Sequence, residues 1–265
     1  MLFANLPFFF LGLFWGSFLG VVADRAERPR SIILDRSRCD HCQKILSWVE
    51  LIPLFSFLLQ KGRCRQCGAK LSLKYPVVEI LTGILTFAIA IKIKETQTPF
   101  FLGLFDWFFF SLLLVIAFSD YLHKEFNSWL VYALAALVVF DVFIKGIFLS
   151  NTHKAFLPTV FEMENWGVLA TFLNHFFGGL FGFLLPLSLF FLTKKRGIGD
   201  GDIWLGAILG LFLGFYSTLN MFFLAFTAGA VVASFLILFK KAKLKSQIAF
   251  SPFLASAAFF VYLFL

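Results

Sequence analysis

The chain has 265 residues, of which 60% are hydrophobic and 14% charged, with a formal net charge of +8 and a mean hydropathy of +0.88. Because a soluble domain is usually about half apolar, this composition excludes an ordinary soluble domain and indicates a protein embedded in a membrane. The positive charge does not call for nucleic acid, since a basic face against anionic lipid headgroups explains it.

Apolar segments long enough to cross a bilayer as helices recur along the whole chain. They are too long and too uniformly apolar for the alternating strands of a membrane barrel. The sequence therefore predicts an all-α polytopic membrane protein with about eight transmembrane helices, the sixth of them short. We place these helices at residues 6–22, 77–93, 100–119, 128–147, 168–192, 203–215, 219–239 and 248–265.

The basic residues predict the orientation. They concentrate in residues 25–74, 194–196 and 240–245 and at Lys124, and the exceptions are Lys92, Lys94, Lys145 and Lys154. When the predicted helices alternate across the bilayer, every basic cluster falls on one side, which the positive-inside rule makes cytoplasmic. The first helix has no preceding basic region and no small-residue cleavage site, so we expect it to be retained with its N-terminus outside. This pattern is typical of a multi-pass protein of the cytoplasmic (inner) membrane.

All cysteines of the chain lie in the loop between the first two predicted helices. They form two CxxC pairs, a spacing typical of tetrahedral zinc bound by four thiolates. A reducing cytoplasm argues against disulfides; a redox CxxC remains an alternative, although two pairs in one small basic loop favour metal. Because four thiolates leave no open coordination position, we expect the zinc to be structural. The predicted ligands are Cys39, Cys42, Cys64 and Cys67.

Between the two cysteine pairs runs the apolar segment WVELIPLFSFLL at residues 48–59. It is too short to span a bilayer. We expect it either to lie at the membrane interface or to pack on the helix bundle.

Two aspartates stand where an apolar segment meets the cytoplasmic side. Asp120 ends the third predicted helix, and Asp202 opens the sixth within Gly197-Ile198-Gly199-Asp200-Gly201-Asp202. An ionisable residue at membrane depth is a functional-site hypothesis, and two carboxylates that meet can share a proton for acid–base chemistry. These acids therefore predict an aspartic peptidase in a membrane. Asp202 could instead be a simple helix cap, although alternating glycines favour close approach of another backbone, and spacing alone does not choose between Asp200 and Asp202.

These motifs resemble those of bacterial prepilin peptidases, the type IV leader peptidase and N-methyltransferase family of GxGD-type aspartic peptidases. The matching segments span nearly the whole chain and are residues 12–19, the two cysteine pairs, residues 51–53, residues 75–83, Asp120 with His123, residues 199–202 and residues 251–255. The resemblance implies a bifunctional enzyme. Such enzymes cleave the leader peptide of type IV prepilins and type II secretion pseudopilins at the cytoplasmic membrane boundary with two aspartates, here Asp120 and Asp202. They then methylate the new N-terminal residue from S-adenosylmethionine.

The residue patterns and the resemblance together predict the parts and partners of the protein. The parts are a first transmembrane helix at residues 1–23, a cytoplasmic zinc-binding loop domain at residues 24–75 and a transmembrane aspartic peptidase core at residues 76–265. The expected partners are prepilins, pseudopilins and the lipid bilayer, with no nucleic acid. The cofactors are structural Zn²⁺ and S-adenosylmethionine; no Gly-rich dinucleotide-type turn marks the methyl-donor site, so its residues stay unassigned.

Two departures from the family pattern and two alternative functions stay open. Trp204 stands where the family often has lysine, and Phe126-Asn127 stands where Ile-Pro is usual. The chain could be a peptidase that lacks methyltransferase activity. It could also be a membrane transporter or proton relay using the same acids, although transporters often show internal repeats and none is seen here.

Overall fold

The computed structural model describes residues 5–25, 35–123, 128–149, 167–194, 198–239 and 249–265. The chain forms two compact units, which we call the N-terminal unit (Met1–Ser119) and the C-terminal unit (Asp120–Leu265). Regular structure in the described residues is helical, and the β-bridges found there are isolated pairs. The all-α prediction is therefore confirmed, whereas the functional division at residues 24 and 76 stays a prediction.

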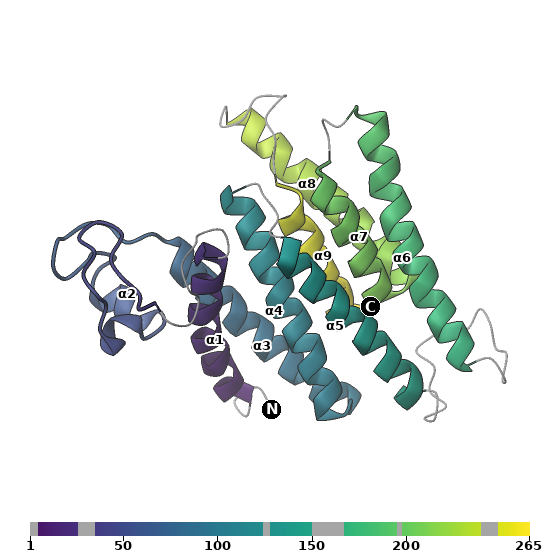
Figure 1. Ribbon diagram of the computed structural model, residues 1–265, viewed down its shortest axis with the longest axis horizontal. Helices are drawn as coiled ribbons and strands as arrows, with labels where there is room; N and C mark the ends of the chain where they lie inside the picture. Colours follow the sequence, from purple (N-terminus) through teal and green to yellow (C-terminus); the bar gives the residue numbers. More distant parts are fainter. Residues whose placement is uncertain (1–4, 26–34, 124–127, 150–166, 195–197, 240–248) are drawn as a thin grey trace. The chain divides into compact units, whose positions relative to one another are not determined.

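The N-terminal unit is built on two helices that pack tightly against each other, α1 and α3 (Figure 1). At Gly16 of α1, an added Cβ would lie 2.8 Å from the Glu79 Cα, so the two backbones touch without room for a side chain. Small residues that allow this close approach are typical of helix packing in membranes. The elements of this unit are α1 (Leu6–Arg25), η2 (Trp48–Leu51), α2 (Phe55–Leu59), α3 (Lys74–Thr96) and most of α4 (Phe100–His123).

The C-terminal unit holds the end of α4 and five further helices. They are α5 (Ser128–Leu149), α6 (Gly167–Leu192), α7 (Asp200–Leu213), α8 (Phe215–Leu238) and α9 (Ser251–Phe264). α6 and α7 lie side by side (Figure 1) and cross through glycines spaced four residues apart on each helix.

The crossing of α6 and α7 is reciprocal. A Cβ added at Gly178 or Gly182 would overlap the carbonyl oxygen of Gly210 or Gly206, and a Cβ added on α7 would overlap those of α6 in the same way. This is the GxxxG type of contact, in which backbones pack directly against each other. Gly206 lies one turn after Asp202 on α7. The crossing therefore holds in place the part of the helix that carries this acid.

Each of the predicted apolar segments corresponds to a helix in the structure. Among the described residues, six helices are long and apolar enough to cross a membrane, and they are α1, α3, α4, α5, α6 and α8. The short sixth segment appears as α7, with 14 residues. The last segment appears as α9, also with 14 residues, and its predicted start at residue 248 lies outside the described residues. Both are shorter than the ~20 residues that a perpendicular span needs.

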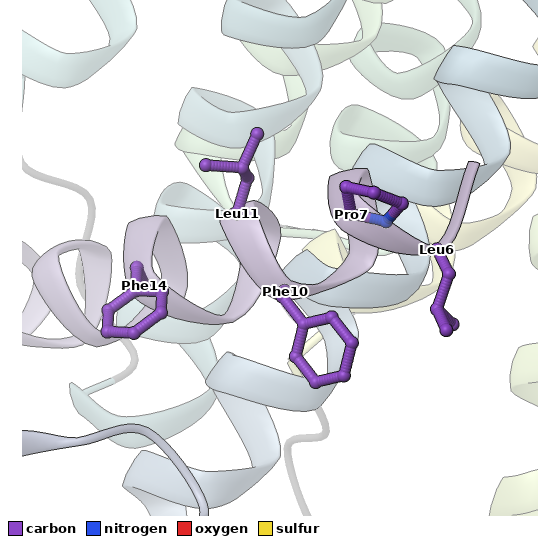
Figure 2. Close-up of a pocket in the computed structure, with 5 residues that line it drawn as sticks. All are labelled: Leu6, Pro7, Phe10, Leu11 and Phe14. Carbon is purple, nitrogen blue, oxygen red and sulfur yellow. The ribbon is translucent and has the colours of Figure 1, made fainter. Parts of the chain in front are cut away.

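A hollow on the surface of α1 is lined by Leu6, Pro7, Phe10, Leu11 and Phe14 (Figure 2). All five side chains are apolar, and Figure 2 shows them projecting from a single helix. With no polar or titratable group in its lining, this hollow suits contact with lipid chains rather than chemistry.

Candidate active site and metal site

Asp202 is placed by the first turn of α7. Its Oδ2 accepts a hydrogen bond from the Gly199 N–H at 3.2 Å, three residues earlier, so the carboxylate closes the helix N-terminus in the manner of a capping box. Asp202 is therefore not the N-cap residue itself, which is Gly199, but one of its carboxylate oxygens does bond to the backbone of the helix start. The other oxygen, Oδ1, faces the Ser251 hydroxyl at 3.0 Å.

The Ser251 hydroxyl joins the two predicted acids. Ser251 is the first residue of α9, and its Oγ lies 2.7 Å from Asp120 Oδ2 and 3.0 Å from Asp202 Oδ1. All three residues are buried. Two carboxylates from α4 and α7, far apart in the sequence, thus meet on one hydroxyl within the C-terminal unit.

Burial distinguishes Asp202 from Asp200. Asp200 is exposed, whereas Asp202 is buried and contacts Ser251. The structure therefore favours Asp202 over Asp200 as the partner of Asp120.

Gly199 is not required by the internal geometry of the turn. Its φ of −77° suits any residue, and among the described residues an added Cβ would meet only the Asp202 Oδ2, at an ordinary 3.5 Å. In the part of the chain that the structure describes, the space in front of this glycine is therefore open to another chain, as the alternating-glycine hypothesis requires. Gly197, the first glycine of that pattern, lies outside the described residues.

The cysteine loop contains two turns of nearly identical geometry. In the first, the Cys39 N–H donates to the Lys44 carbonyl at 3.0 Å; in the second, the Cys64 N–H donates to the Ala69 carbonyl at 2.9 Å. An isolated β-bridge flanks each turn. The residue after each CxxC pair, Gln43 or Gly68, has a positive φ, which is the conformation that favours the glycine at the second turn.

The two turns bring the four predicted ligands together. The sulfur atoms of Cys39, Cys42, Cys64 and Cys67 all lie within 4.8 Å of one another and could hold a metal ion. The Cys39–Cys67 and Cys42–Cys64 sulfurs are 3.9 and 4.0 Å apart. Tetrahedral Zn²⁺ with bonds of ~2.3 Å needs sulfurs about 3.8 Å apart, whereas a disulfide needs ~2.05 Å. The donor set and its spacing therefore fit a zinc ion.

The thiols differ in how readily they ionise. The backbone N–H groups of Cys67 and Gln66 lower the pKa of the Cys64 thiol to about 6. At Cys42 the Lys44 N–H favours the thiolate, but partial burial and the three other thiols raise its pKa to about 11. Between these two pKa values Cys64 is ionised, whereas Cys42 keeps its own proton. A cation that binds both sulfurs would displace that proton.

Two matches to known families cover most of the chain. Residues 10–93 match the family described as "Bacterial Peptidase A24 N-terminal domain", and residues 107–234 match the "Type IV leader peptidase family". A relative from Bacillus subtilis, named "Prepilin leader peptidase/N-methyltransferase", is 30% identical over 97% of this chain and 92% of its own length. The chain belongs to the type IV leader peptidase family.

Two further relatives carry the same name as the Bacillus protein. One from Myxococcus xanthus is 34% identical over 87% of this chain, which spans 62% of that relative's own length. One from Aeromonas hydrophila is 32% identical over 87% of this chain and 72% of its own length. No solved structure gave a significant match. The family matches include all four cysteines and both aspartates of this leader peptidase homologue but end before α9.

Other buried acids of this family member have partners of a different kind. Glu79 of α3 accepts the Leu54 N–H at 2.9 Å, and the Ser17 side chain is another hydrogen-bond partner. This carboxylate pins the apolar segment at residues 48–59 to the first turns of α3, so its role exceeds the helix-dipole effect expected from the sequence. Asp141 pairs with Lys145, one turn away, at 2.8 Å.

The apolar segment at residues 48–59 presents its large side chains outward. Trp48, Leu58 and Leu59 are 76%, 70% and 69% exposed, and Phe55 is also exposed. Within the N-terminal unit these side chains therefore do not pack into the helix core.

The first departure from the family pattern, Trp204, lies on the surface of α7. Trp204 is 60% exposed, and its ring lies 5.5 Å from that of Phe183, so it covers the surface of the α6–α7 pair. Phe126-Asn127 lies outside the described residues.

Ser251 is the site residue that sequence reasoning missed as a functional group. It stands within the SPFLA segment that was matched to the family pattern, but no local spacing links it to either aspartate. A serine that opens a helix before proline looks like an ordinary start signal. Only the folded arrangement places its hydroxyl between the acids.

Proposed function

We propose that this chain is a bifunctional prepilin peptidase and N-methyltransferase of the cytoplasmic (inner) membrane, with Asp120 and Asp202 as its catalytic pair. It cleaves the leader peptide of type IV prepilins and type II secretion pseudopilins at the cytoplasmic face. It then methylates the new N-terminal residue. The names of the relatives support the two activities, and the basic loops support the orientation.

The observation that carries the peptidase proposal is the pair of buried carboxylates joined through one hydroxyl. When the pair holds one proton, the ionised carboxylate takes a proton from water as that water attacks the peptide carbonyl carbon. The protonated carboxyl gives its proton to the carbonyl oxygen. The tetrahedral intermediate then breaks. The carboxyl that took a proton from water gives it to the leaving nitrogen, and the other carboxylate takes a proton from a hydroxyl of the intermediate, which restores the starting state.

The position of the pair explains why the cut falls at a membrane boundary. Asp120 lies near the end of α4 and Asp202 at the start of α7, each beside a polar stretch of chain. In a substrate with a charged leader and an apolar helix, the junction between the two lies at this same membrane boundary. Water attack requires extended backbone, because helix interiors hide their carbonyls. The open space at Gly199 lets such a backbone approach closely.

The metal proposed for the cysteine loop is structural Zn²⁺, held by Cys39, Cys42, Cys64 and Cys67. Four thiolates complete its tetrahedral shell, so the ion supplies folding energy to the loop rather than a reactive water. S-adenosylmethionine supplies the methyl group for the second reaction. Among the described residues, we assign none to binding this donor.

The test is incubation of the purified protein with a prepilin and labelled S-adenosylmethionine, with cleavage and label scored separately. We expect both a shortened pilin and label on its new N-terminus. Cleavage without label would leave a peptidase alone. No cleavage, together with ion or proton movement across proteoliposomes, would replace the proposal by a transporter that uses the same acids.

A further inference from the structure

We propose that Ser251 is a positioning residue of the carboxylate pair, whose hydroxyl holds Asp120 and Asp202 together in the state that carries one shared proton. This inference rests on the proposed peptidase function and adds a residue to its site. Ser251 lies beyond residue 234, where the family match ends.

Burial confines the Ser251 hydroxyl to its two acidic partners. The residue is 0% exposed, and both aspartates are also buried. Its Oγ lies 2.7 Å from Asp120 Oδ2 and 3.0 Å from Asp202 Oδ1, and these lengths are typical of hydrogen bonds between oxygen atoms. The hydroxyl therefore cannot exchange these partners for bulk water.

The number of protons follows from the chemistry of a hydroxyl group. A serine hydroxyl has one proton to donate and lone pairs that accept. It can donate to only one carboxylate, so both contacts are hydrogen bonds when the other carboxyl is protonated and donates to Oγ. If both carboxylates were ionised, the Ser251 Oγ would lie against one carboxylate oxygen with no proton between the two atoms. The geometry thus matches one proton shared by Asp120 and Asp202.

The neighbouring backbone favours the single negative charge that remains. Asp202 and Ser251 lie in the first turns of α7 and α9, and helix N-termini carry partial positive charge. The Gly199 N–H donates to the second oxygen of Asp202, which disfavours a proton on that oxygen. The surroundings therefore favour the form of the carboxylate pair that carries a single negative charge.

The functional consequence concerns the range of pH over which the enzyme works. Water activation needs one ionised and one protonated carboxyl at the same time. By bonding to both, the hydroxyl stabilises this form against loss and against gain of a proton, which widens its pH range. A side chain that served packing alone would not affect the width of the pH–rate profile.

The experiment compares Ser251→Ala, Ser251→Thr and the control Ser256→Ala. Ser256 lies on the same helix, is exposed and bonds only to the Phe253 carbonyl in the contacts described. We measure kcat and KM for prepilin cleavage across pH in the full-length protein. We expect Ser251→Ala to lower kcat about ten- to hundredfold, the worth of a hydrogen bond to a charged group, with KM unchanged and a narrower pH–rate profile. Ser251→Thr restores the width, and Ser256→Ala resembles wild type.

Methylation of a pre-cleaved pilin by each variant reports folding independently of the carboxylate pair. A folded Ser251→Ala protein with wild-type kcat and wild-type pH width would overturn the inference. A lower kcat with unchanged pH width would also overturn it, because that result indicates packing alone. The proposed peptidase function fails by a different result, namely no prepilin cleavage by the wild-type protein, whereas cleavage by Asp120→Asn or Asp202→Asn would overturn only the assignment of the carboxylate pair.

Discussion

Both units of this protein bury carboxylates, but the partners of those carboxylates differ. In the N-terminal unit, Glu79 accepts a backbone N–H from Leu54 and holds a loop in place. In the C-terminal unit, Asp120 and Asp202 meet at the Ser251 hydroxyl. The Glu79 carboxyl connects two segments of backbone and so has a structural role, whereas two acids that meet on one hydroxyl are placed to share a proton. Burial alone therefore does not identify a catalytic carboxylate; the kind of group that it contacts does.

Glu50 illustrates the structural case most clearly. The Ser47 N–H, together with Lys44, lowers the pKa of this carboxyl to about 2. Its ionised form therefore stabilises the loop at all pH values above its unfolded pKa of ~4.3, and this contribution is lost as the pH falls towards 2. No physiological change of pH would make Glu50 a proton donor.

The strongest test of the comparison exchanges one acid in each unit for its amide. We expect Asp120→Asn and Asp202→Asn each to lower cleavage at least about a hundredfold, because an amide cannot serve as general acid or base. Glu79→Gln should keep most cleavage, since an amide oxygen still accepts the Leu54 N–H. The measurement is the rate of prepilin cleavage by each variant, compared at equal methyltransferase activity so that equal amounts of folded protein are compared.

The exposed Asp200 provides the matched control for this test. Asp200→Asn should cleave at nearly the wild-type rate. If instead Asp200→Asn is inactive and Asp202→Asn is active, the assignment of the reactive acid is wrong. If Glu79→Gln is as inactive as Asp120→Asn, the distinction between the two kinds of buried acid fails.

Removal of the metal should affect the N-terminal unit first. We predict one tightly bound Zn²⁺ per chain in protein purified without added zinc, and loss of that ion in Cys39→Ser. The loop should then become sensitive to proteases, since structural zinc supplies much of the folding energy of such small sites. Metal analysis and limited proteolysis are the measurements. Two disulfides and no metal in fresh membranes would contradict both the zinc site and its cytoplasmic location.

The glycine crossing of the C-terminal unit gives a smaller effect on stability. In Gly206→Ala the added Cβ overlaps the Gly182 carbonyl oxygen, and overpacking of this kind costs ~1–3 kcal/mol, more than the ~1 kcal/mol gained in helix propensity. We expect a lower Tm and a several-fold loss of cleavage, since α7 carries Asp202. In Gly229→Ala the nearest atoms to the added Cβ are ring carbons at 3.8–3.9 Å, an ordinary contact distance, so this variant should be neutral or more stable. Equal Tm values would show that the crossing does not matter.

The elements that depend on local pattern were predictable from the sequence. Long apolar runs give the helices, and the CxxC spacing gives the cysteine cluster, because both signals lie within a short stretch of chain. The sequence also singled out Asp120 and Asp202 as acids at helix ends. Spacing alone did not separate Asp200 from Asp202: the resemblance named Asp202, and burial in the fold distinguishes these two acids of the same helical turn.

Partners that come from distant helices were not predictable. Ser251 has no spacing relation to either aspartate, and Glu79 gave no sign that it would accept an N–H from Leu54. The reciprocal glycines of α6 and α7 are visible as small residues four apart, but their pairing depends on how two helices cross. Contacts of this kind are decided by packing, which a single sequence does not encode locally.

The last prediction, with the smallest expected effect on cleavage, concerns the segment at residues 48–59. Glu79 pins this segment to the first turns of α3, one of the helices long enough to cross the membrane, while Trp48 and Leu58 point outward. Tryptophan is favoured at the headgroup level of bilayers, and short apolar segments lie in the same region. We therefore expect these side chains to enter the membrane interface rather than to contact water.

A nitroxide-bearing unnatural amino acid at Leu58, in proteoliposomes, measures this directly. The matched control is the same label at Lys70, which is exposed on the second cysteine turn. We expect the label at Leu58 to be accessible to oxygen and protected from a water-soluble nickel complex, and the label at Lys70 to show the reverse. Leu58→Glu should then lower cleavage only a few-fold, because the segment anchors the N-terminal unit and contains neither acid of the pair. Full nickel access at Leu58 would place the segment in water, and protection from both reagents would place it against protein; either result would contradict an interfacial anchor.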